Sequence, residues 1–146
     1  MSCPVCSGDY EGKEPDIKMQ IDTNTLLLGL FGRTLKHSLS PLMHNRTLER
    51  MGLNAVYYPF EIEPDKLEYA VNGLRAFNIL GVNVTIPYKE AVIPYLDELT
   101  GSAQACRAVN LIKNVHGHLT GYNTDGAGFL VSLLDEGVSP RARVLF

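Results

Sequence analysis

The feature that most constrains the fold of this chain is an alternation of short apolar runs with amphipathic stretches, which begins at Thr25. The apolar runs have the length of strands and the amphipathic stretches have the length of helices. This pattern is typical of α/β domains with a mostly parallel sheet. Residues 26–31 are continuously apolar and end at Gly32, as expected of a buried strand. The sequence therefore predicts a three-layer α/β/α domain.

Further strands follow from the same pattern. Residues 55–60 are rich in Val and Tyr and predict a second strand. A third strand is predicted over residues 79–86, where Pro87 ends it. Residues 108–113 and 118–122 are expected to pair as a hairpin, because a short segment with a glycine separates them.

Two helices are predicted in the first half of the chain. The first begins at Ser40, a good N-cap residue that a proline follows, and ends near Gly52. The second opens at Pro64. Its apolar residues fall on one stripe that we expect to be buried: Leu67, Ala70, Val71 and Leu74.

Two further helical stretches are predicted in the second half. A short one follows Pro87, is interrupted at Pro94 and resumes toward Leu99. The last helix starts at residues 123–124 and stops at Gly137. It is expected to bury four apolar side chains: Phe129, Leu130, Leu133 and Leu134.

The pattern divides the chain into three parts. Residues 1–24 are polar, without periodicity, and predict a flexible N-terminal extension. Residues 25–140 form one domain of ordinary size. Residues 141–146 look like the start of another strand, so we expect the sequence to stop short of a further domain.

Charge and composition narrow the range of partners. The net charge is −3 and no basic run could follow a nucleic-acid backbone. No apolar run is long enough to span a bilayer, and the first residues do not resemble a secretory signal. We therefore expect a cytoplasmic protein without a nucleic-acid or membrane partner. A homodimer is left open.

The three cysteines do not indicate a disulfide framework, since their number is odd and no signal peptide is evident. Cys3 and Cys6 have the spacing of half a zinc site or of a redox pair. No second pair completes such a site, and His116 and His118 lie far away in the sequence. We expect no metal site and interpret the two cysteines as exposed thiols of the N-terminal extension.

Polar side chains gather in three segments, of which the first is the loop between the first strand and the first helix. This segment, residues 32–45, carries two hydroxyls, Ser38 and Ser40. Ser40 has a ready structural explanation as the helix cap, whereas Ser38 has none so obvious. The two serines are therefore candidate ligand-binding residues of unequal weight.

The second segment, residues 83–90, ends the third strand. Alternation places Asn83 and Thr85 on one face of this strand. The opposite face carries the apolar residues: Val82, Val84 and Ile86. Polar groups at the carboxyl end of a parallel strand lie where open α/β sheets bind ligands. Lys89 follows at a helix start, where the helix dipole disfavours a cation, so the lysine is poorly placed for stability alone. The alternative is an ordinary solvated lysine.

The third segment joins residues 108–110 to residues 121–126 across the hairpin. It carries Asn110 and Asp125, and the carboxylate in the first turn of a helix is also explained by the dipole. Together the three segments offer hydroxyls, amides, one lysine and one aspartate, which suit a small polyhydroxylated acid. The sequence contains no glycine-rich phosphate loop. The candidate segment, residues 126–128, lacks the third glycine of dinucleotide-binding turns.

These segments resemble the shikimate dehydrogenases, from about Leu26 to Phe146. The family's patterns G-x-P-x-x-H-S-x-S-P-x-x-H-N, N-V-T-x-P-x-K-E, A-V-N-T and N-T-D-G recur here in the same order and at similar spacing. Three positions depart from the family: Thr34 replaces proline, Arg107 replaces a common glycine, and Leu111 replaces threonine.

The resemblance implies a role for each candidate residue. Ser38 and Ser40 would bind the substrate carboxylate. Three residues would hold ring hydroxyls: Asn83, Thr85 and Asn110. Lys89 and Asp125 would be the catalytic pair. The coenzyme would be NADP, held by a domain whose first strand begins at residues 141–146.

The activity that the resemblance implies is the reversible NADPH-dependent reduction of 3-dehydroshikimate to shikimate. A quinate/shikimate dehydrogenase shares these motifs and is the alternative enzyme. A shikimate-binding module without catalysis and a purely structural interaction domain are the alternatives of other classes. The 146 residues alone are expected to be inactive, because no phosphate-binding turn holds a coenzyme near the substrate.

Overall fold

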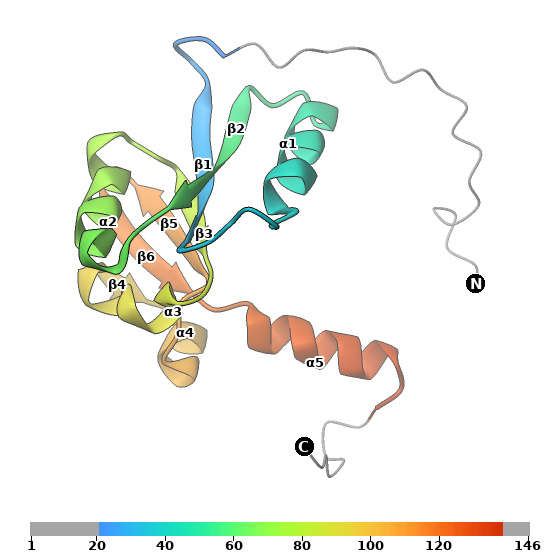
Figure 1. Cartoon of the computed structure of the whole chain (residues 1–146). Helices are drawn as coiled ribbons and strands as arrows, with labels where there is room; N and C mark the ends of the chain where they lie inside the picture. The colour runs from blue at the N-terminus through green and yellow to red at the C-terminus, as the bar shows by residue number, and fades with distance from the viewer. Residues whose placement is uncertain (1–20, 139–146) are drawn as a thin grey trace, which may run out of the picture.

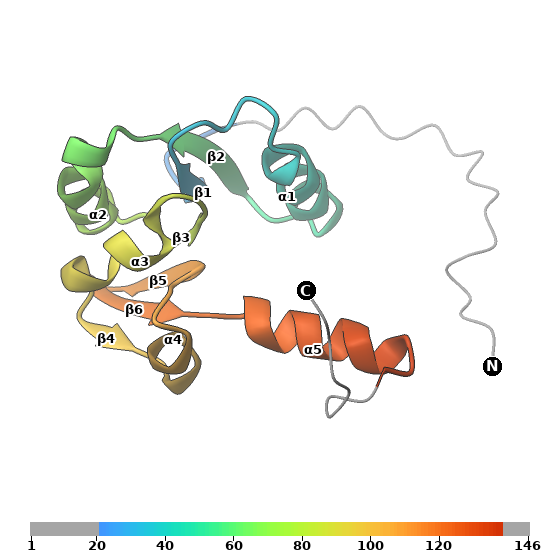
Figure 2. The same ribbon diagram turned by 60° about the horizontal axis from the view of Figure 1, so that its bottom comes forward.

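The computed structural model describes residues 21–138, which form a six-stranded mixed sheet with helices on both faces (Figures 1 and 2). The strands are β1 Leu26–Gly32, β2 Ala55–Glu61, β3 Gly81–Val84, β4 Glu98–Leu99, β5 Leu111–Val115 and β6 His118–Tyr122. Their order in the sheet is β2-β1-β3-β5-β6-β4. Three of the five pairings are parallel, and those of β5 with β3 and with β6 are antiparallel. The predicted α/β class with a mostly parallel sheet is confirmed.

The helices form the outer layers. They are α1 Ser40–Arg50, α2 Leu67–Ala76, α3 Tyr88–Ala91, α4 Gly101–Cys106 and α5 Asp125–Asp135, with two 3-10 turns, η1 Pro64–Lys66 and η2 Ile93–Tyr95. Helix α1 lies against β1 and β2 on one face, while α2, α3 and α4 lie on the other (Figure 2). Of the predicted stripe of α2, Leu67, Val71 and Leu74 are buried, and Ala70 is partly buried.

The core lies mainly between the sheet and the layer of α2, α3 and α4. There Val82 and Val84 of β3 are buried with Leu74 of α2, as alternation along the strand requires. A smaller cluster on the α1 face joins Leu30 of β1 to Tyr57 of β2. The two clusters hold the sheet from both sides, so the carboxyl ends of β1 and β3 are set by packed side chains.

Two predictions about the edges of the first elements are wrong. Ser40 is the first residue of α1, and the cap position belongs to Leu39, which has no side-chain cap bond. The third strand stops at Val84, because Tyr88 N–H donates to the Thr85 carbonyl and turns the chain out of the sheet. Ile86 consequently lies outside the strand and is 77% exposed instead of sharing the buried face.

The segment before Leu99 is a strand where a helix was predicted. Glu98 and Leu99 form β4 and pair with β6, so tertiary hydrogen bonding overrides the local helical pattern. The predicted hairpin is present, although β5 begins at Leu111. Its two turn residues, His116 and Gly117, have φ angles of 52° and 89°, the positive values that a tight hairpin turn needs.

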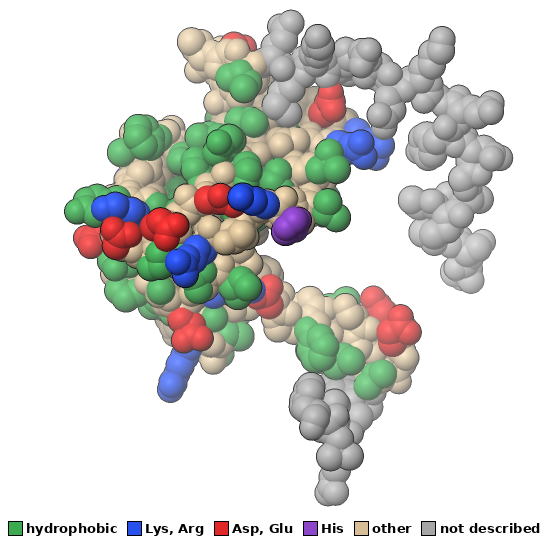
Figure 3. Space-filling view, viewed as in Figure 1, with side chains coloured by type: hydrophobic (Ala, Val, Ile, Leu, Met, Phe, Trp, Pro, Cys, Tyr) green, Lys and Arg blue, Asp and Glu red, His purple; other side chains and the backbone are tan. Residues whose placement is uncertain are grey.

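Helix α5 contradicts the predicted burial most clearly. None of its residues is buried, and Phe129 and Leu134 are 63% and 51% exposed. The helix extends away from the sheet in both views (Figures 1 and 2). Its apolar side chains lie on the surface of the face drawn in Figure 3. Its predicted end is correct, since Gly137 takes a positive φ of 72°.

Several expectations fall outside residues 21–138. They concern Cys3, Cys6 and the segment 141–146. Within the described part of the chain, no helix has the length and apolarity to cross a membrane.

Candidate active site

The topology brings the three predicted polar segments to one edge of the sheet. Strands β1 and β3 are parallel, and Phe31 lies beside Val84, so the loops after both strands leave from the same edge. Strand β5 runs against β3 and begins at that edge, with Leu111 beside Asn83. Strand β6 ends there, with Tyr122 beside Leu111. This edge is where parallel α/β sheets bind ligands.

An ion pair between Lys89 and Asp125 lies at the centre of this edge. The Lys89 Nζ and the Asp125 Oδ2 are 2.7 Å apart, although 36 positions separate the two residues. Lys89 belongs to the short helix α3, and Asp125 is the first residue of α5. Their side chains are 33% and 53% exposed, so a ligand in solvent can reach both.

Asn110 completes the group around the carboxylate. Its Nδ2 donates to the Asp125 Oδ1 at 2.7 Å and to the Thr124 Oγ1 at 2.8 Å. The hydrogen bond from Lys89 holds the pKa of the Asp125 carboxyl below its ordinary value, and the bond from Asn110 acts in the same direction. The carboxylate is therefore kept charged as the partner of the lysine.

The backbone around this group is fixed by hydrogen bonds to the core strands. The Asn110 carbonyl accepts from Val84 N–H at 2.9 Å, and the Asn110 N–H donates to the Tyr122 carbonyl at 2.9 Å. The Lys89 carbonyl accepts from Val109 N–H at 2.7 Å. Lysine and asparagine are thus held in relation to each other by the sheet and by α3, independently of their own side chains.

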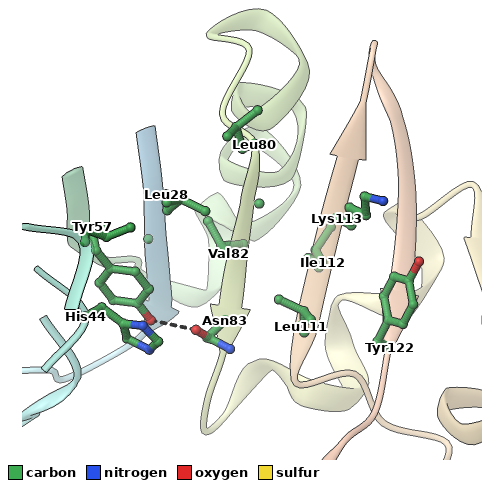
Figure 4. Close-up of a pocket in the computed structure, with 13 residues that line it drawn as sticks. Leu28, His44, Tyr57, Leu80, Val82, Asn83, Leu111, Ile112, Lys113 and Tyr122 are labelled. Carbon is green, nitrogen blue, oxygen red and sulfur yellow. Dashed lines mark hydrogen bonds between the residues drawn. The ribbon is translucent and has the colours of Figure 1, made fainter. Parts of the chain in front are cut away.

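Asn83 lies on the α1 face of β3, where Tyr57 determines the orientation of its amide (Figure 4). The Tyr57 hydroxyl donates to the Asn83 Oδ1 at 2.8 Å, and the Asn83 Nδ2 donates to the Asn110 carbonyl at 3.4 Å. Burial raises the pKa of Tyr57 to about 12, so the hydroxyl stays a donor at neutral pH. His44 of α1 stacks on the tyrosine ring at a centroid distance of 4.3 Å.

Beside Asn83 opens a cavity of about 680 Å³ on the α1 face of the sheet (Figure 4). Its walls come from α1 and from the five strands β2, β1, β3, β5 and β6 and are mostly apolar; they include Leu28, Leu48, Leu111 and Tyr122. A ligand at the sheet edge therefore meets polar groups toward the Lys89–Asp125 pair and apolar surface toward the cavity.

Ser38 lies in the loop between β1 and α1 and Ser40 is the first residue of α1, at the same edge. The Ser38 Oγ accepts from the Ser40 N–H at 3.3 Å, so Ser38 makes a local turn contact just before α1. Ser38 also borders a second cavity of about 640 Å³ beside β2. Within residues 21–138, no hydrogen bond joins either serine to the Lys89–Asp125 pair.

Thr85 follows directly after β3 and is half-buried. Its N–H donates to the Phe31 carbonyl at 2.9 Å, which ties the end of β3 to β1. None of the hydrogen bonds found between the described residues uses its hydroxyl, which therefore has capacity for a ligand.

Three residues around the site were missed from the sequence: Tyr57, His44 and Asn123. Asn123 is buried, and its side chain accepts from the Asp125 N–H at 3.0 Å and donates to the Ala108 carbonyl at 2.9 Å. An asparagine two residues before a helix-opening acid is a recognisable local signal for such a turn. Tyr57 gave no such signal, since its contact with Asn83 spans 26 positions.

The arrangement is suited to proton transfer at a hydroxyl or carbonyl oxygen. Lys89 is the group that can give or take the proton, and Asp125 can orient it and accept a hydrogen bond from a ligand hydroxyl. Asn83, Thr85 and Asn110 add amide and hydroxyl partners. Between residues 21 and 138, no cluster of three or more His, Cys, Asp or Glu could hold a metal ion.

Fold and site together define a mixed α/β domain with a polar, lysine-containing site at the ends of its strands. Residues 30–112 match the family described as the shikimate dehydrogenase substrate binding domain. The chain belongs to this family.

Among curated proteins, the chain is 56% identical over 128 residues to the shikimate dehydrogenase (NADP(+)) of Syntrophomonas wolfei. That similarity covers 88% of this chain and 44% of the relative. Among solved structures, it resembles a shikimate dehydrogenase in complex with NADP+, with a TM-score of 0.78, 44% identity and coverage of 82% and 42%. It also resembles the Listeria monocytogenes shikimate 5-dehydrogenase in complex with shikimate and NAD, with a TM-score of 0.78, 41% identity and coverage of 84% and 43%. The chain thus spans less than half the length of these relatives.

Proposed function

We propose that this chain is the substrate-binding and catalytic part of an NADP-dependent shikimate dehydrogenase, which interconverts 3-dehydroshikimate and shikimate. The observation that carries the proposal is the contact of Lys89 with Asp125 at 2.7 Å, with Asn110 on the same carboxylate. Three residues from separate segments form one group there, and family membership supports the reaction. The proposed enzyme would act in the cytoplasm on a small-molecule substrate.

In this proposal the chain binds the substrate by its polar groups. Ser38 and Ser40 hold the carboxylate, since their loop leaves the same sheet edge as the end of β3. Asn83 presents the second N–H of its Nδ2 to a ring hydroxyl, because Tyr57 occupies the Oδ1 and the Asn110 carbonyl accepts from the first N–H. Thr85 and Asn110 supply further hydrogen bonds to the ring.

Lys89 transfers the proton at the reacting oxygen. In the direction of reduction, NADPH held by the enzyme would supply the hydride to the carbonyl carbon, and the Lys89 ammonium group gives a proton to its oxygen, which becomes a hydroxyl. In the direction of oxidation, the neutral amine takes the proton back. Asp125 stays ionised, because its lowered pKa keeps it a carboxylate, and it orients both the lysine and the substrate hydroxyl.

The residues of this chain do not fit the coenzyme. The 146 residues contain no glycine-rich turn at dinucleotide spacing, and the start of α5 holds the Asp125 carboxylate, which would repel a phosphate. We therefore assign the chain no part in binding NADP, and the coenzyme would be held elsewhere in the enzyme.

Two measurements on the 146-residue chain test the proposal. Calorimetric titration with shikimate should show saturable binding. Thermal unfolding with increasing shikimate should show a rising melting temperature, because a ligand specific for the native state stabilises it. Quinate is titrated in parallel, since the quinate/shikimate dehydrogenases are the alternative. Mixing shikimate and NADP+ with this chain alone should give no turnover. A chain that melts at the same temperature at all shikimate concentrations would overturn the proposed function.

A further inference from the structure

Helix α5 carries Asp125 into the site but has little other attachment to the domain. Asp125 is its first residue, and none of its 11 residues is buried. Its apolar side chains, such as Phe129 and Leu134, face solvent. The position of the carboxylate is therefore not fixed by packing of the helix, and the polar contacts at its N-terminal end must fix it.

Asn123 makes the most deeply buried of these contacts. Asn123 is only 7% exposed, and its side chain connects two parts of the backbone. The Oδ1 accepts from the Asp125 N–H at 3.0 Å, and the Nδ2 donates to the Ala108 carbonyl at 2.9 Å. It thus links the first residue of α5 to the segment that leads into Asn110.

The segment at the other end of this link is part of the site. Ala108 precedes Val109, whose N–H donates to the Lys89 carbonyl at 2.7 Å. A continuous set of hydrogen bonds therefore runs from the Lys89 backbone through residues 108–109 and the Asn123 side chain to the Asp125 backbone. This path sets the distance between the two backbones, while the ion pair joins their side chains.

We propose that Asn123 is a positioning residue, which fixes the start of α5 and thereby holds the Asp125 carboxylate beside Lys89. It does not touch the reacting atoms and acts through Asp125. Replacing it by alanine leaves the Ala108 carbonyl and the Asp125 N–H without their buried partner. The first turn of α5 then keeps its contacts with Asn110 but loses its link to the Ala108 backbone, so Asp125 spends less time against the lysine. The effect on shikimate rests on the proposed function; the effect on Asp125 does not.

The test follows the Asp125 carboxyl by carbon NMR as pH is varied, in the 146-residue chain without any ligand. In Asn123→Ala the carboxyl is expected to titrate at a higher pH than in the parent, because the Lys89 bond that lowers its pKa is formed less often. Shikimate affinity should weaken by about tenfold, as expected from loosening a hydrogen bond to a charged group.

Asn114→Ala is the matched control. Asn114 is equally buried, at 7% exposure, and donates to the Leu74 and Ile79 carbonyls from β5. Its removal should lower the melting temperature without changing the Asp125 titration. A folded Asn123→Ala chain in which Asp125 titrates as in the parent would overturn the proposal.

Asn123→Ser provides a second variant if the alanine variant does not fold. Serine keeps an acceptor for the Asp125 N–H but is too short to reach the Ala108 carbonyl. We expect a smaller rise in the pH at which the Asp125 carboxyl titrates. An unchanged titration pH would overturn the role of the link to Ala108. If the titration responds but shikimate does not bind the parent chain, the proposed function fails while the positioning role stands.

Discussion

The Lys89–Asp125 pair contributes little to the stability of the domain and is open to solvent. Partly exposed ion pairs add about 0–1 kcal/mol, because solvent screens the charges and both side chains lose freedom. The pair is therefore better explained by what it does to a ligand than by stability, and substitutions should separate the two.

The substitution Lys89→Ala is expected to impair catalysis far more than folding. In an enzyme that joins this chain to the coenzyme-binding half of a relative, kcat should fall by about two to four decades, the usual contribution of a general acid–base group. KM should change much less, because the serines and asparagines remain. A variant with raised KM and intact kcat would show that Lys89 only binds the substrate. Lys66→Ala is the control, since this lysine pairs with Asp65 on the surface.

Tyr57 makes the domain sensitive to alkali. Its pKa is raised by burial from 10.0 to about 12, so the folded state retains the hydroxyl proton more tightly than the unfolded state. The stabilisation is complete below pH 10 and is lost as pH rises toward 12. Between these values the melting temperature of the parent should fall more than that of Tyr57→Phe. Tyr69→Phe, at a residue 72% exposed, should follow the parent. Equal pH dependence in all three chains would contradict the assignment.

At the scale of elements, the departure from the family at residue 107 has a structural consequence. Arg107 ends helix α4 in the left-handed region, with φ and ψ of 51° and 34°. This region is costly for residues with a Cβ and open to glycine, which explains why glycine is common there in the family. The Asn110 backbone nearby is held by its hydrogen bonds to Val84 of β3 and Tyr122 of β6.

Replacing this residue by glycine should stabilise the chain. Arg107→Gly is expected to raise the free energy of unfolding by about 0.5–1 kcal/mol, the usual difference at a left-handed helix end. Ala105→Gly is the matched control in the same helix and should lower it by about 1 kcal/mol, because there glycine only adds freedom to the unfolded chain. Denaturant unfolding measures both. A loss of stability in Arg107→Gly would mean that the side chain contributes more than its backbone conformation costs.

At the scale of the whole molecule, residues 21–138 fall into two parts. Most elements pack on the sheet, whereas helix α5 projects from it. Strands β1 and β3 and helix α2 share the main cluster of buried residues. Helix α5 contributes no buried residue and is held at its N-terminal end by Asn110 and Asn123. The two parts should therefore open with different free energies.

Hydrogen exchange should reveal this difference in the 146-residue chain. Amides of β1 and β3 are expected to exchange only on global unfolding. Amides in the second half of α5 should exchange faster by several decades, because opening this part exposes almost no buried surface. Saturating shikimate should slow exchange mainly at residues 123–128, if it binds Asp125. Equal protection of α5 and β1 would show that the helix is covered in solution.

Sequence reasoning was most successful where structure is local. The apolar runs of β1 and β2, the buried stripe of α2, the hairpin and the stop at Gly137 follow from side-chain period and turn chemistry. The candidate residues followed from motif resemblance, which identified Lys89 and Asp125 individually. For the strands, the stripe, the hairpin and the helix end, the determining interactions lie within a few residues of one another, so the sequence contains the information directly.

The tertiary structure alone decided which residues meet and which surfaces are covered. Only the sheet order brings Lys89 to Asp125, and only pairing with β6 makes residues 98–99 a strand. The apolar face of α5 was expected to be buried, yet it is exposed. Periodicity shows that a helix has an apolar face, whereas burial depends on another element being present to cover it. The sequence thus determined the elements and the chemical groups, and long-range packing determined their juxtaposition.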